Sequence, residues 1–499
     1  MRKDFSSAIG GANIEFGATA IEDMVFDLGS RASITKVLAG LQCLYHDKAR
    51  TDKILRLIEA DVNPDGVVSK EHGREGMNYW QIMVLSAARL GANLTFDELQ
   101  DFSTHHQALR VMLGFNSWEA CSPAGFSYRL INDNLNKLNP ETIIAIDQII
   151  VELGHELAPE AAETVRGDSF VVGTNIHYPI DRRQLADGIR KLIVIGAKIG
   201  EVYHIAGWRK HAQLMKILNR HTKGLSMATR ARGEAGKARL EKHYLEYLSF
   251  AESIIRRACE TMEALEIKLG TSAASSSEYS DLTYYLSASE YMRQLTVRRV
   301  IDKEIITHHE KLFSIFEPHT ELINRGKIPQ PIEFGHRVLV IEDAAGFICY
   351  HEVMDIGAVD KVVLAQAMET LQQRLNGKIR SASFDCGFHS PQNQTHLAEI
   401  VAQPCLPTKG AKQAKAQRAG ASIEWKAARD YHAGVESAIH GLQAGNGLDR
   451  CRDKTFNGYK RYVSLGILGR NMMTLGRLVL AARDPKAEAA KTLREAPSF

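Results

Sequence analysis

The sequence predicts an α/β protein: an N-terminal all-helical domain, then a mixed sheet flanked by helices, interrupted by a long helical insertion. Three observations predict this class. Apolar residues recur at helical spacing through most of the first 160 residues. Strand-like segments occur near residue 166 and return only at residue 334, so a helical stretch separates two parts of one sheet. Finally, an expected strand, helix and strand follow one another over residues 347–384, which favours a parallel pair of strands.

Composition narrows the class of protein. The 499 residues are enough for roughly three domains, and only 13 are proline, which favours long helices. The net charge is +3, so nucleic-acid affinity would have to come from local basic clusters. The seven cysteines form no Cys-x-x-Cys pair, and we expect reduced thiols. The chain shows neither an apolar signal segment nor a long apolar run, so we expect a cytoplasmic protein without membrane contact.

The N-terminal part predicts a series of helices. Residues 33–60 suggest two helices, and residues 78–90 form a strongly amphipathic one. Thr95 and Glu98 have the spacing of a capping box, which predicts the start of the next helix. A helix, a short turn and a capped helix are compatible with a helix-turn-helix that binds DNA. A plain helical bundle explains the same pattern equally well.

The sheet is predicted from segments on either side of the insertion. Asp168 stands at the start of a strand that ends before Pro179, and Asp385 closes a strand and precedes a Gly turn. Between them we expect a hairpin over residues 337–354 and a helix over residues 359–375, and a short strand follows at residues 400–406.

Carboxylates in this order suggest a metal site. Glu436 lies on a later predicted helix, where Arg429, His432 and Glu436 fall three and four residues apart on one face. Asp168 is the candidate third carboxylate beside Asp385 and Glu436, because carboxylates from separate elements can converge on a divalent cation. From the residues alone, a structural role is the favoured explanation of Asp168 and Asp385, because most aspartates at strand ends form turns. The rival carboxylates are Asp343, which reads as part of a hairpin turn, Asp355 and Glu424.

Several motifs carry a resemblance to a known family. They are Asp168-Ser followed by Asn175-Ile-His-Tyr-Pro, Glu333-Phe-Gly-His-Arg-Val, Phe384-Asp-Cys-Gly-Phe, His432-Ala-Gly-Val-Glu, Gly447-Leu-x-Arg-Cys and Asn471. In this order, from about residue 70 to 478, the chain resembles DDE-type transposases of bacterial insertion sequences. It is most similar to the insertion-sequence group left outside the named families.

The resemblance implies a fold, an activity and a cofactor. The sheet is expected to be ribonuclease-H-like, and Asp168, Asp385 and Glu436 are expected to be catalytic ligands of two Mg²⁺ or Mn²⁺ ions about 4 Å apart. The expected reaction is DNA strand cleavage and strand transfer at the ends of an insertion sequence. The implied partners are double-stranded DNA, as terminal inverted repeats and as target, and further copies of the chain in a homodimer or larger oligomer. Such a protein would act at the bacterial nucleoid.

Two basic segments are candidates for DNA contact. Residues 207–243 contain ten Lys or Arg against two Glu, an excess of +8, with Arg209 and Lys210 at their start. Between Asp385 and Glu436 a second group recurs every third residue, and it consists of Lys409, Lys412, Lys415 and Arg418. We expect both groups, together with Arg429 and His432, to contact DNA. Solvated surface is the alternative for each.

The expected domain boundaries follow from these segments. They are a helical, DNA-binding domain at residues 1–160, a catalytic domain at residues 161–200 and 330–480, an insertion at residues 201–329 and a flexible tail at residues 481–499. A DNA-binding protein with an inactive transposase-derived core is the alternative function. A glycosidase with two carboxylates is a third possibility, disfavoured by the basic segments and the aromatic content of 7%.

Overall fold

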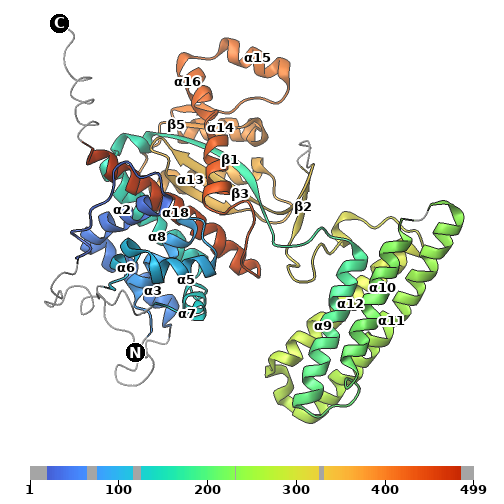
Figure 1. Ribbon diagram of the computed structural model, residues 1–499. Coiled ribbons are helices and arrows are strands. Elements are labelled where there is room, and N and C mark those ends of the chain that lie inside the picture. The colour runs from blue at the N-terminus through green and yellow to red at the C-terminus, as the bar shows by residue number, and fades with distance from the viewer. Residues whose placement is uncertain (1–18, 65–75, 116–124, 231, 325–330, 485–499) are drawn as a thin grey trace, which may run out of the picture. The chain divides into compact units, whose positions relative to one another are not determined.

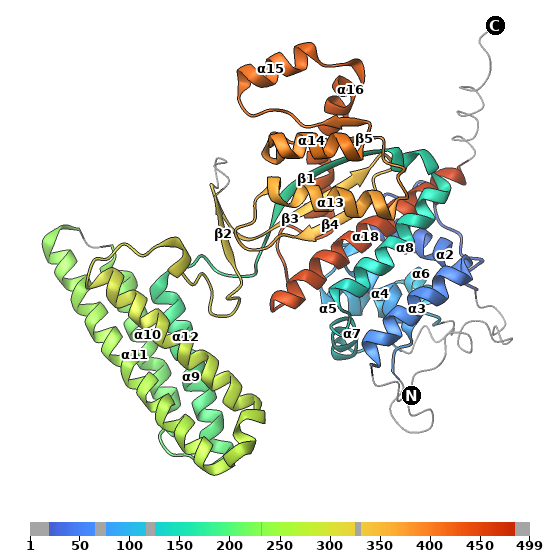
Figure 2. The same cartoon turned by 180° about the vertical axis from the view of Figure 1, so that it is seen from behind.

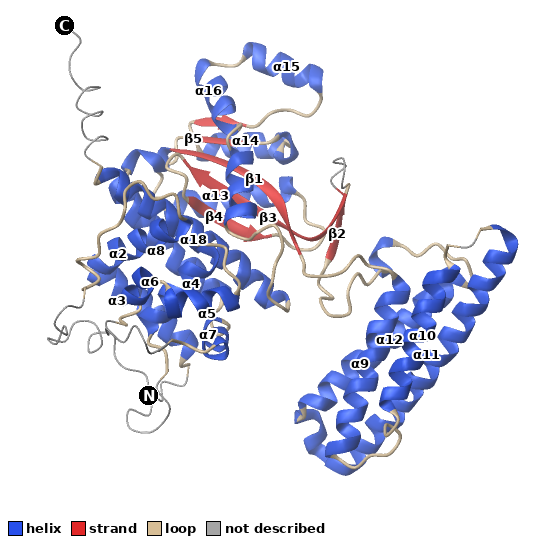
Figure 3. Ribbon diagram, in the orientation of Figure 1, coloured by secondary structure: helices blue, strands red, loops and turns tan. Residues whose placement is uncertain are grey.

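The computed structural model describes residues 19–64, 76–115, 125–230, 232–324 and 331–484. The chain divides into two compact units, one formed by Met1–Asn175 with Ile323–Phe499 and the other by Ile176–Leu322. The first unit contains the sheet and the N-terminal helices, and the second is mainly helical, with the first residues of β2 at its end (Figure 3).

The sheet is open and mixed, with the neighbour order β2-β3-β1-β5-β6 and β4 paired with β3 as well. β1 is antiparallel to β3, and β3 is antiparallel to β4, whereas β1 and β5 are parallel, as are β5 and β6. The strands are β1 (Thr164–Gly173), β2 (Glu321–Asn324), β3 (Ile332–Asp343), β4 (Ile348–Val353), β5 (Ser381–Phe384) and β6 (Gln403–Cys405). The expected α/β class with a mixed sheet is therefore confirmed.

Helices cover both faces of this sheet. Side chains of a strand alternate between its faces, and Ser169 of β1 hydrogen-bonds Asp360 of α13 (Asp360–Arg374). Arg166 of the same strand instead donates to the carbonyl of Tyr431 in α16 (Ile423–His432). α13 and α14 (Pro391–Ile400) therefore lie on one face, and α16 and α17 (Val435–His440) lie on the other (Figures 1 and 2).

The N-terminal helices pack around the last helix, α18 (Phe456–Ala482), rather than forming a unit of their own. α18 and α2 approach closely because glycine has no side chain: a Cβ on Gly476 of α18 would lie 1.8 Å from the carbonyl oxygen of Lys36. The buried Arg89 guanidinium also pairs with Asp453, just before α18, at 2.5 Å. The other helices of this part are α2 (Ser33–His46), α3 (Lys48–Val62), α4 (Tyr79–Gly91), α5 (Phe96–His105), α6 (Gln107–Met112), α7 (Tyr128–Leu135) and α8 (Pro140–Leu157).

The second unit packs four long helices around an apolar core that includes Leu192, Trp208 and Tyr247. Small residues permit the close helix contacts, since a Cβ on Gly188 would lie 2.3 Å from the hydroxyl of Ser289. Its helices are α9 (Asp181–Val202), α10 (His211–Ala228), α11 (Gly233–Leu269) and α12 (Ser277–Val300).

The unit boundaries differ from the expected domains. α9 was expected in the catalytic domain, but it packs against α10, α11 and α12, so the inserted unit begins at Ile176. Residues 485–499, which make up most of the expected tail, lie outside the described residues. The six described cysteines are free thiols. Among the described residues, no helix combines the length and the apolar character needed to cross a membrane.

Candidate functional site

Asp168 and Asp385 lie next to each other across two parallel strands. Gly167 of β1 pairs in register with Phe384 of β5, so the following residues, Asp168 and Asp385, occupy the next register position. Neighbouring strands lie about 4.8 Å apart. Both carboxylates are partly exposed, and the backbone N–H of Ser169 donates to Oδ1 of Asp168 at 2.7 Å.

The helix above these strands presents a stripe of polar residues to them. Arg429 of α16 donates to Oδ1 of Asp385 at 3.4 Å, and His432 contacts the carbonyl oxygen of Ser383 at 3.2 Å. Glu436 of α17 continues the same stripe one turn after His432, because residues 433 and 434 keep helical backbone angles. Glu436 is exposed, and α17 packs on β1.

The three expected ligands do not form a tight cluster. Their oxygen atoms are not all within 4.8 Å of one another, although all three residues belong to the described part of the chain. Two of them, Asp168 and Asp385, are brought together by the sheet. The approach of Glu436 to this pair stays a prediction.

His432 is held as a neutral imidazole. Its pKa is lowered to about 4, chiefly by burial and also by the positive charge of Arg429, while the charge of Asp385 acts in the opposite direction. A carbonyl oxygen can only accept, so Nδ1 of His432 carries the proton that is donated to Ser383. His432 therefore fastens α16 to β5 and leaves Nε2 unprotonated at neutral pH.

The basic group between the two acidic motifs lies mostly on one helix. Lys412, Lys415 and Arg418 belong to α15 (Ala411–Gly420), where residues three apart are neighbours on the helix surface. Lys415 and Arg418 line a cavity of about 460 Å³ that also contains Asp385 and Arg429. Lys412 is exposed and not part of this lining, and Lys409 precedes the helix and is also exposed.

The second unit carries a cationic surface on α10 and the first half of α11. Arg209 and Lys210 lie just before α10, and all ten basic residues of this segment are exposed. Of these ten, all in the described part of the chain, only Lys237 forms an ion pair, with Glu234. Elsewhere in this unit some arginines pair with carboxylates, as Arg298 does with Glu304. The imbalance of charge is therefore local to α10 and α11.

The exposed side chains of α4 and α5 do not favour the interpretation of these helices as a helix-turn-helix that binds DNA. The capping box of α5 is formed, with Thr95 and Glu98 exchanging hydrogen bonds. However, α4 is buried from Ile82 to Gly91, and the exposed side chains of α5 include Asp97, Glu98 and Asp101. An acidic helix face repels the phosphate backbone.

A buried polar cluster has the spacing of a metal site but is explained by hydrogen bonds. His155, Asp343 and Cys349 bring their ligand atoms within 4.8 Å of one another. Oδ1 of Asp343 accepts hydrogen bonds from three backbone N–H groups of the β3–β4 turn. Its Oδ2 accepts hydrogen bonds from Nε2 of His155 at 2.7 Å and from the thiol of Cys349 at 3.4 Å. Burial raises the pKa of the Cys349 thiol, whereas metal binding needs the thiolate. Asp343 is thus the hairpin residue that the sequence predicts.

Two motif segments turn out to have structural contacts. Asn471 donates to Asp147 of α8 and bonds both backbone groups of Ile348 in β4, so it holds α18, α8 and the sheet together. The segment that includes Asp449 and Cys451 hydrogen-bonds the end of β1 at Gly173. These contacts give both motif segments a structural role.

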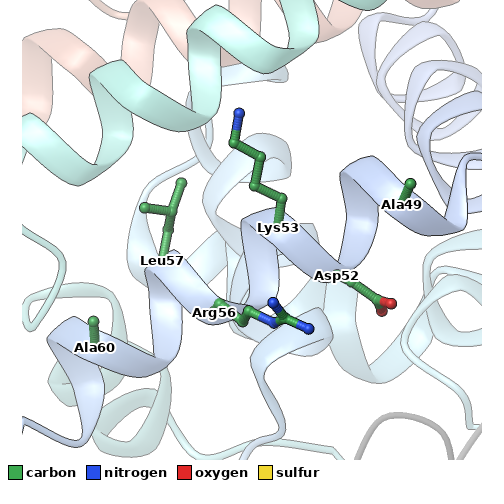
Figure 4. Close-up of a pocket in the computed structure, with 6 residues that line it drawn as sticks. All are labelled: Ala49, Asp52, Lys53, Arg56, Leu57 and Ala60. Carbon is green, nitrogen blue, oxygen red and sulfur yellow. The ribbon is translucent and has the colours of Figure 1, made fainter.

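A further cavity of about 570 Å³ lies along α3, lined by Ala49, Asp52, Lys53, Arg56, Leu57 and Ala60. Its charged side chains come from one helix, and Lys53 points away from Asp52 and Arg56 (Figure 4). Polar groups do not converge there, so this cavity lacks the mark of a binding site.

One charged cluster was not predicted: Arg166, Arg470 and Arg477 line one cavity with Glu342, and the first two pair with its carboxylate. These residues come from β1, β3 and α18, and only the fold brings them together.

Comparison of the chain with protein-family models, with curated proteins and with solved structures finds no match.

Proposed function

We propose that the protein is a metal-dependent DNA strand-transfer enzyme, a DDE transposase with a ribonuclease-H-like core. One observation carries the proposal: Gly167 of β1 pairs with Phe384, the last residue of β5, and the partly exposed residues Asp168 and Asp385 directly follow these two paired residues. Two nearby carboxylates repel each other and destabilise the folded state unless a cation or another positive group neutralises them. A divalent cation bound between them is the simplest neutralising group for a site that must also bind phosphate.

The topology of the sheet supports the ribonuclease-H-like assignment. Such sheets contain three antiparallel strands followed by two parallel strands that are reached through helices. β1, β3 and β4 form the antiparallel part here, and β5 and β6 follow in parallel, with α13 and α14 as the preceding helices. The two aspartates fall on the central strand and directly after its parallel neighbour.

The donor set fits Mg²⁺ or Mn²⁺. Hard cations prefer carboxylate oxygens, and Mg²⁺ keeps several waters, so Asp168 and Asp385 with Glu436 are sufficient ligands. When bound, two such ions activate an attacking oxygen and stabilise a leaving one in phosphodiester displacement. Glu436 would complete the ligand set from α17, on the stripe that begins with Arg429.

Arg429 has two tasks in this arrangement. Its guanidinium neutralises Asp385 at 3.4 Å, and its Nη1 is buried without a hydrogen-bond partner. A phosphate oxygen at the carboxylates would supply that partner, because guanidinium groups bind phosphate through forked hydrogen bonds. His432 positions the helix and, being neutral at pH 7, adds no positive charge.

The DNA partner is inferred from charge. Lys415 and Arg418 line the cavity that contains Asp385, so they are suited to hold the strand that enters the site. The cationic surface of α10 and α11 offers unpaired side chains for the duplex backbone. The proposal extends to terminal inverted repeats and target DNA as substrates, and to a homodimer or larger oligomer on paired ends.

The test compares two Asp→Asn variants on DNA that carries the sequences flanking the gene. Asp385→Asn should lower Mg²⁺-dependent strand cleavage by on the order of 10²-fold or more, since removing one transition-state stabiliser commonly costs that much. Asp355→Asn is the matched control, because Asp355 is an exposed carboxylate just after β4 and has no ion-pair partner among the described residues. Full activity of Asp385→Asn would refute the proposal.

A DNA-binding protein with an inactive core remains the second candidate. The separation of the three carboxylates and the ion pair between Arg429 and Asp385 favour it. Calorimetry with Mn²⁺ separates the two candidates, because an active site binds the ion in the wild type and loses it in Asp385→Asn. DNA binding without any Mn²⁺ heat would support the inactive core.

A further inference from the structure

A small polar cavity of about 260 Å³ lies where the end of β3 meets α17 and α18. Its lining side chains and small residues include Arg166, Glu342, Gly434, Ser437, Arg470 and Arg477. The cavity is smaller than pockets that hold whole cofactors, which are about 300–1,000 Å³. Its size and polarity instead suit a single small ion.

The cavity has more positive than negative groups. Glu342 is buried, and its carboxylate accepts hydrogen bonds from Nε and Nη2 of Arg166 at 2.9 and 2.6 Å. Arg470 reaches the same carboxylate only at 3.5 Å. Asp343 also borders the cavity, but its oxygens are engaged by the β3–β4 turn and by His155. Three guanidinium groups therefore share one available carboxylate.

Two of these guanidinium groups keep unused donors. Nε of Arg470 is buried and has no hydrogen-bond partner, and Arg477 donates Nη2 to the carbonyl of Ala345 at 2.8 Å. The two arginines lie seven residues apart on one face of α18, with Thr474 between them bonded to the carbonyl of Gly346. Burial lowers the pKa of Arg477, and the charge of Arg470 lowers it further, so the pair is held together against repulsion.

We propose that Arg470 and Arg477, with Arg166 behind them, form a binding site for a tetrahedral oxyanion of the phosphate class. Guanidinium forks match phosphate geometry, and an anion would use the free donors and offset the repulsion. Arg166 is held by Glu342 and by the Tyr431 carbonyl, which fixes the wall of the site.

The position of the cavity relates it to the proposed function, on which the choice of ligand rests. Arg166 precedes Asp168 by two residues on the same face of β1, about 6.6 Å along the strand. Ser437 of the lining directly follows Glu436. A DNA strand with its reacting phosphate at the carboxylates can therefore place another backbone phosphate in this cavity. Free inorganic phosphate is the other source of the same chemistry.

The first experiment measures binding of inorganic phosphate by thermal unfolding, with chloride at equal ionic strength as reference. Phosphate should raise the Tm of the wild type, and the Arg470→Gln/Arg477→Gln variant should lose this rise. Arg483→Gln is the matched control: it removes the same charge just after α18, where Arg483 bonds Gln42 away from the cavity. An equal rise in all three proteins, or none in the wild type, overturns the site.

The exposed Arg477 permits a milder variant if the double variant does not fold. Arg477→Lys keeps the charge but loses the forked donors, so the phosphate concentration for half of the Tm rise should increase severalfold. An unchanged value would contradict a guanidinium-built site.

A second experiment identifies the source of the phosphate. Both proteins in this experiment carry Asp385→Asn to prevent cleavage; one has the intact cavity and the other also has Arg470→Gln/Arg477→Gln. Inorganic phosphate should compete with a DNA duplex for the protein with the intact cavity and not for the protein that lacks the two arginines. If the two proteins bind DNA with equal affinity while phosphate still raises the Tm of the protein with the intact cavity, the DNA source is overturned and a free-phosphate site is supported. The Tm rise does not depend on Asp385, so failure of the site and failure of the proposed activity are distinguishable.

Discussion

Replacement of His432 by Asn tests how the site is assembled. The pKa of His432 falls from 6.5 in the unfolded chain to about 4 in the fold, chiefly through burial. As the pH falls below 6.5, the unfolded chain takes up a proton that the folded chain refuses, so stability present above pH 6.5 is lost towards pH 4. A difference of about 2.5 pKa units corresponds to about 3.4 kcal/mol.

The Asn side chain keeps an N–H donor near the position of Nδ1, so the bond to the Ser383 carbonyl is retained without a titrating group. Between pH 7 and 4, the wild type should lose about 3 kcal/mol more than His432→Asn. His351, whose pKa is also lowered to about 4 by burial, contributes equally to both proteins and cancels in the comparison.

Hydrogen–deuterium exchange over a pH series gives the free energy of opening for peptides that cover β5 and α16. This local measurement avoids the assumption that both units unfold together. His440→Asn, at an exposed histidine of α17, is the control and should follow the wild type. Parallel curves for His432→Asn and the wild type would refute the assignment of a buried, neutral imidazole.

Three further predictions concern other parts of the first unit. Gly476→Ala should destabilise the fold by about 3 kcal/mol or more, because its Cβ would overlap a backbone carbonyl of α2, whereas Gly445→Ala, with open space around it, should leave the Tm nearly unchanged. Burial raises the pKa of Asp147 from 3.8 to about 7, so the stability that its protonated form contributes is lost as the pH rises over that range. Asp147→Asn should therefore flatten the plot of the free energy of unfolding in urea against pH between these values. Arg429→Gln removes the cation that competes for Asp385, so Mn²⁺ should bind more tightly in calorimetry while DNA cleavage falls; weaker Mn²⁺ binding would contradict the ion-pair argument.

Local signals predicted local structure well. The capping box at Thr95, the hairpin around Gly346 and the helix that leads to Asp385 are all present, since each depends on neighbouring residues. The four-residue strand β2 was not predicted because so short a segment has no periodicity of its own. The start of the inserted unit was placed too late because α9 has the same amphipathic pattern in either unit.

The site was predictable only in part. Asp385 was expected where a strand ends, and it directly follows β5, whereas Asp168 was expected at the start of a strand and lies in the middle of β1. The pairing of Gly167 with Phe384 relates the two positions, which no local pattern predicts. The basic group over residues 409–418 was recognisable by its spacing, but only the fold shows that Lys415 and Arg418 line the cavity with Asp385 while Lys409 lies before α15. The arginine cluster around Glu342 had no signal, because its members are up to 311 positions apart in the chain.

The central place of α18 among the first helices affects how the chain can fold during synthesis. α2, α4 and α8 emerge from the ribosome long before residues 456–482, so their apolar faces lack a partner until translation is almost complete. Contacts of such high sequence separation form slowly. A polypeptide truncated before α18 would therefore expose these faces and aggregate, and we expect chaperone dependence in the nascent chain.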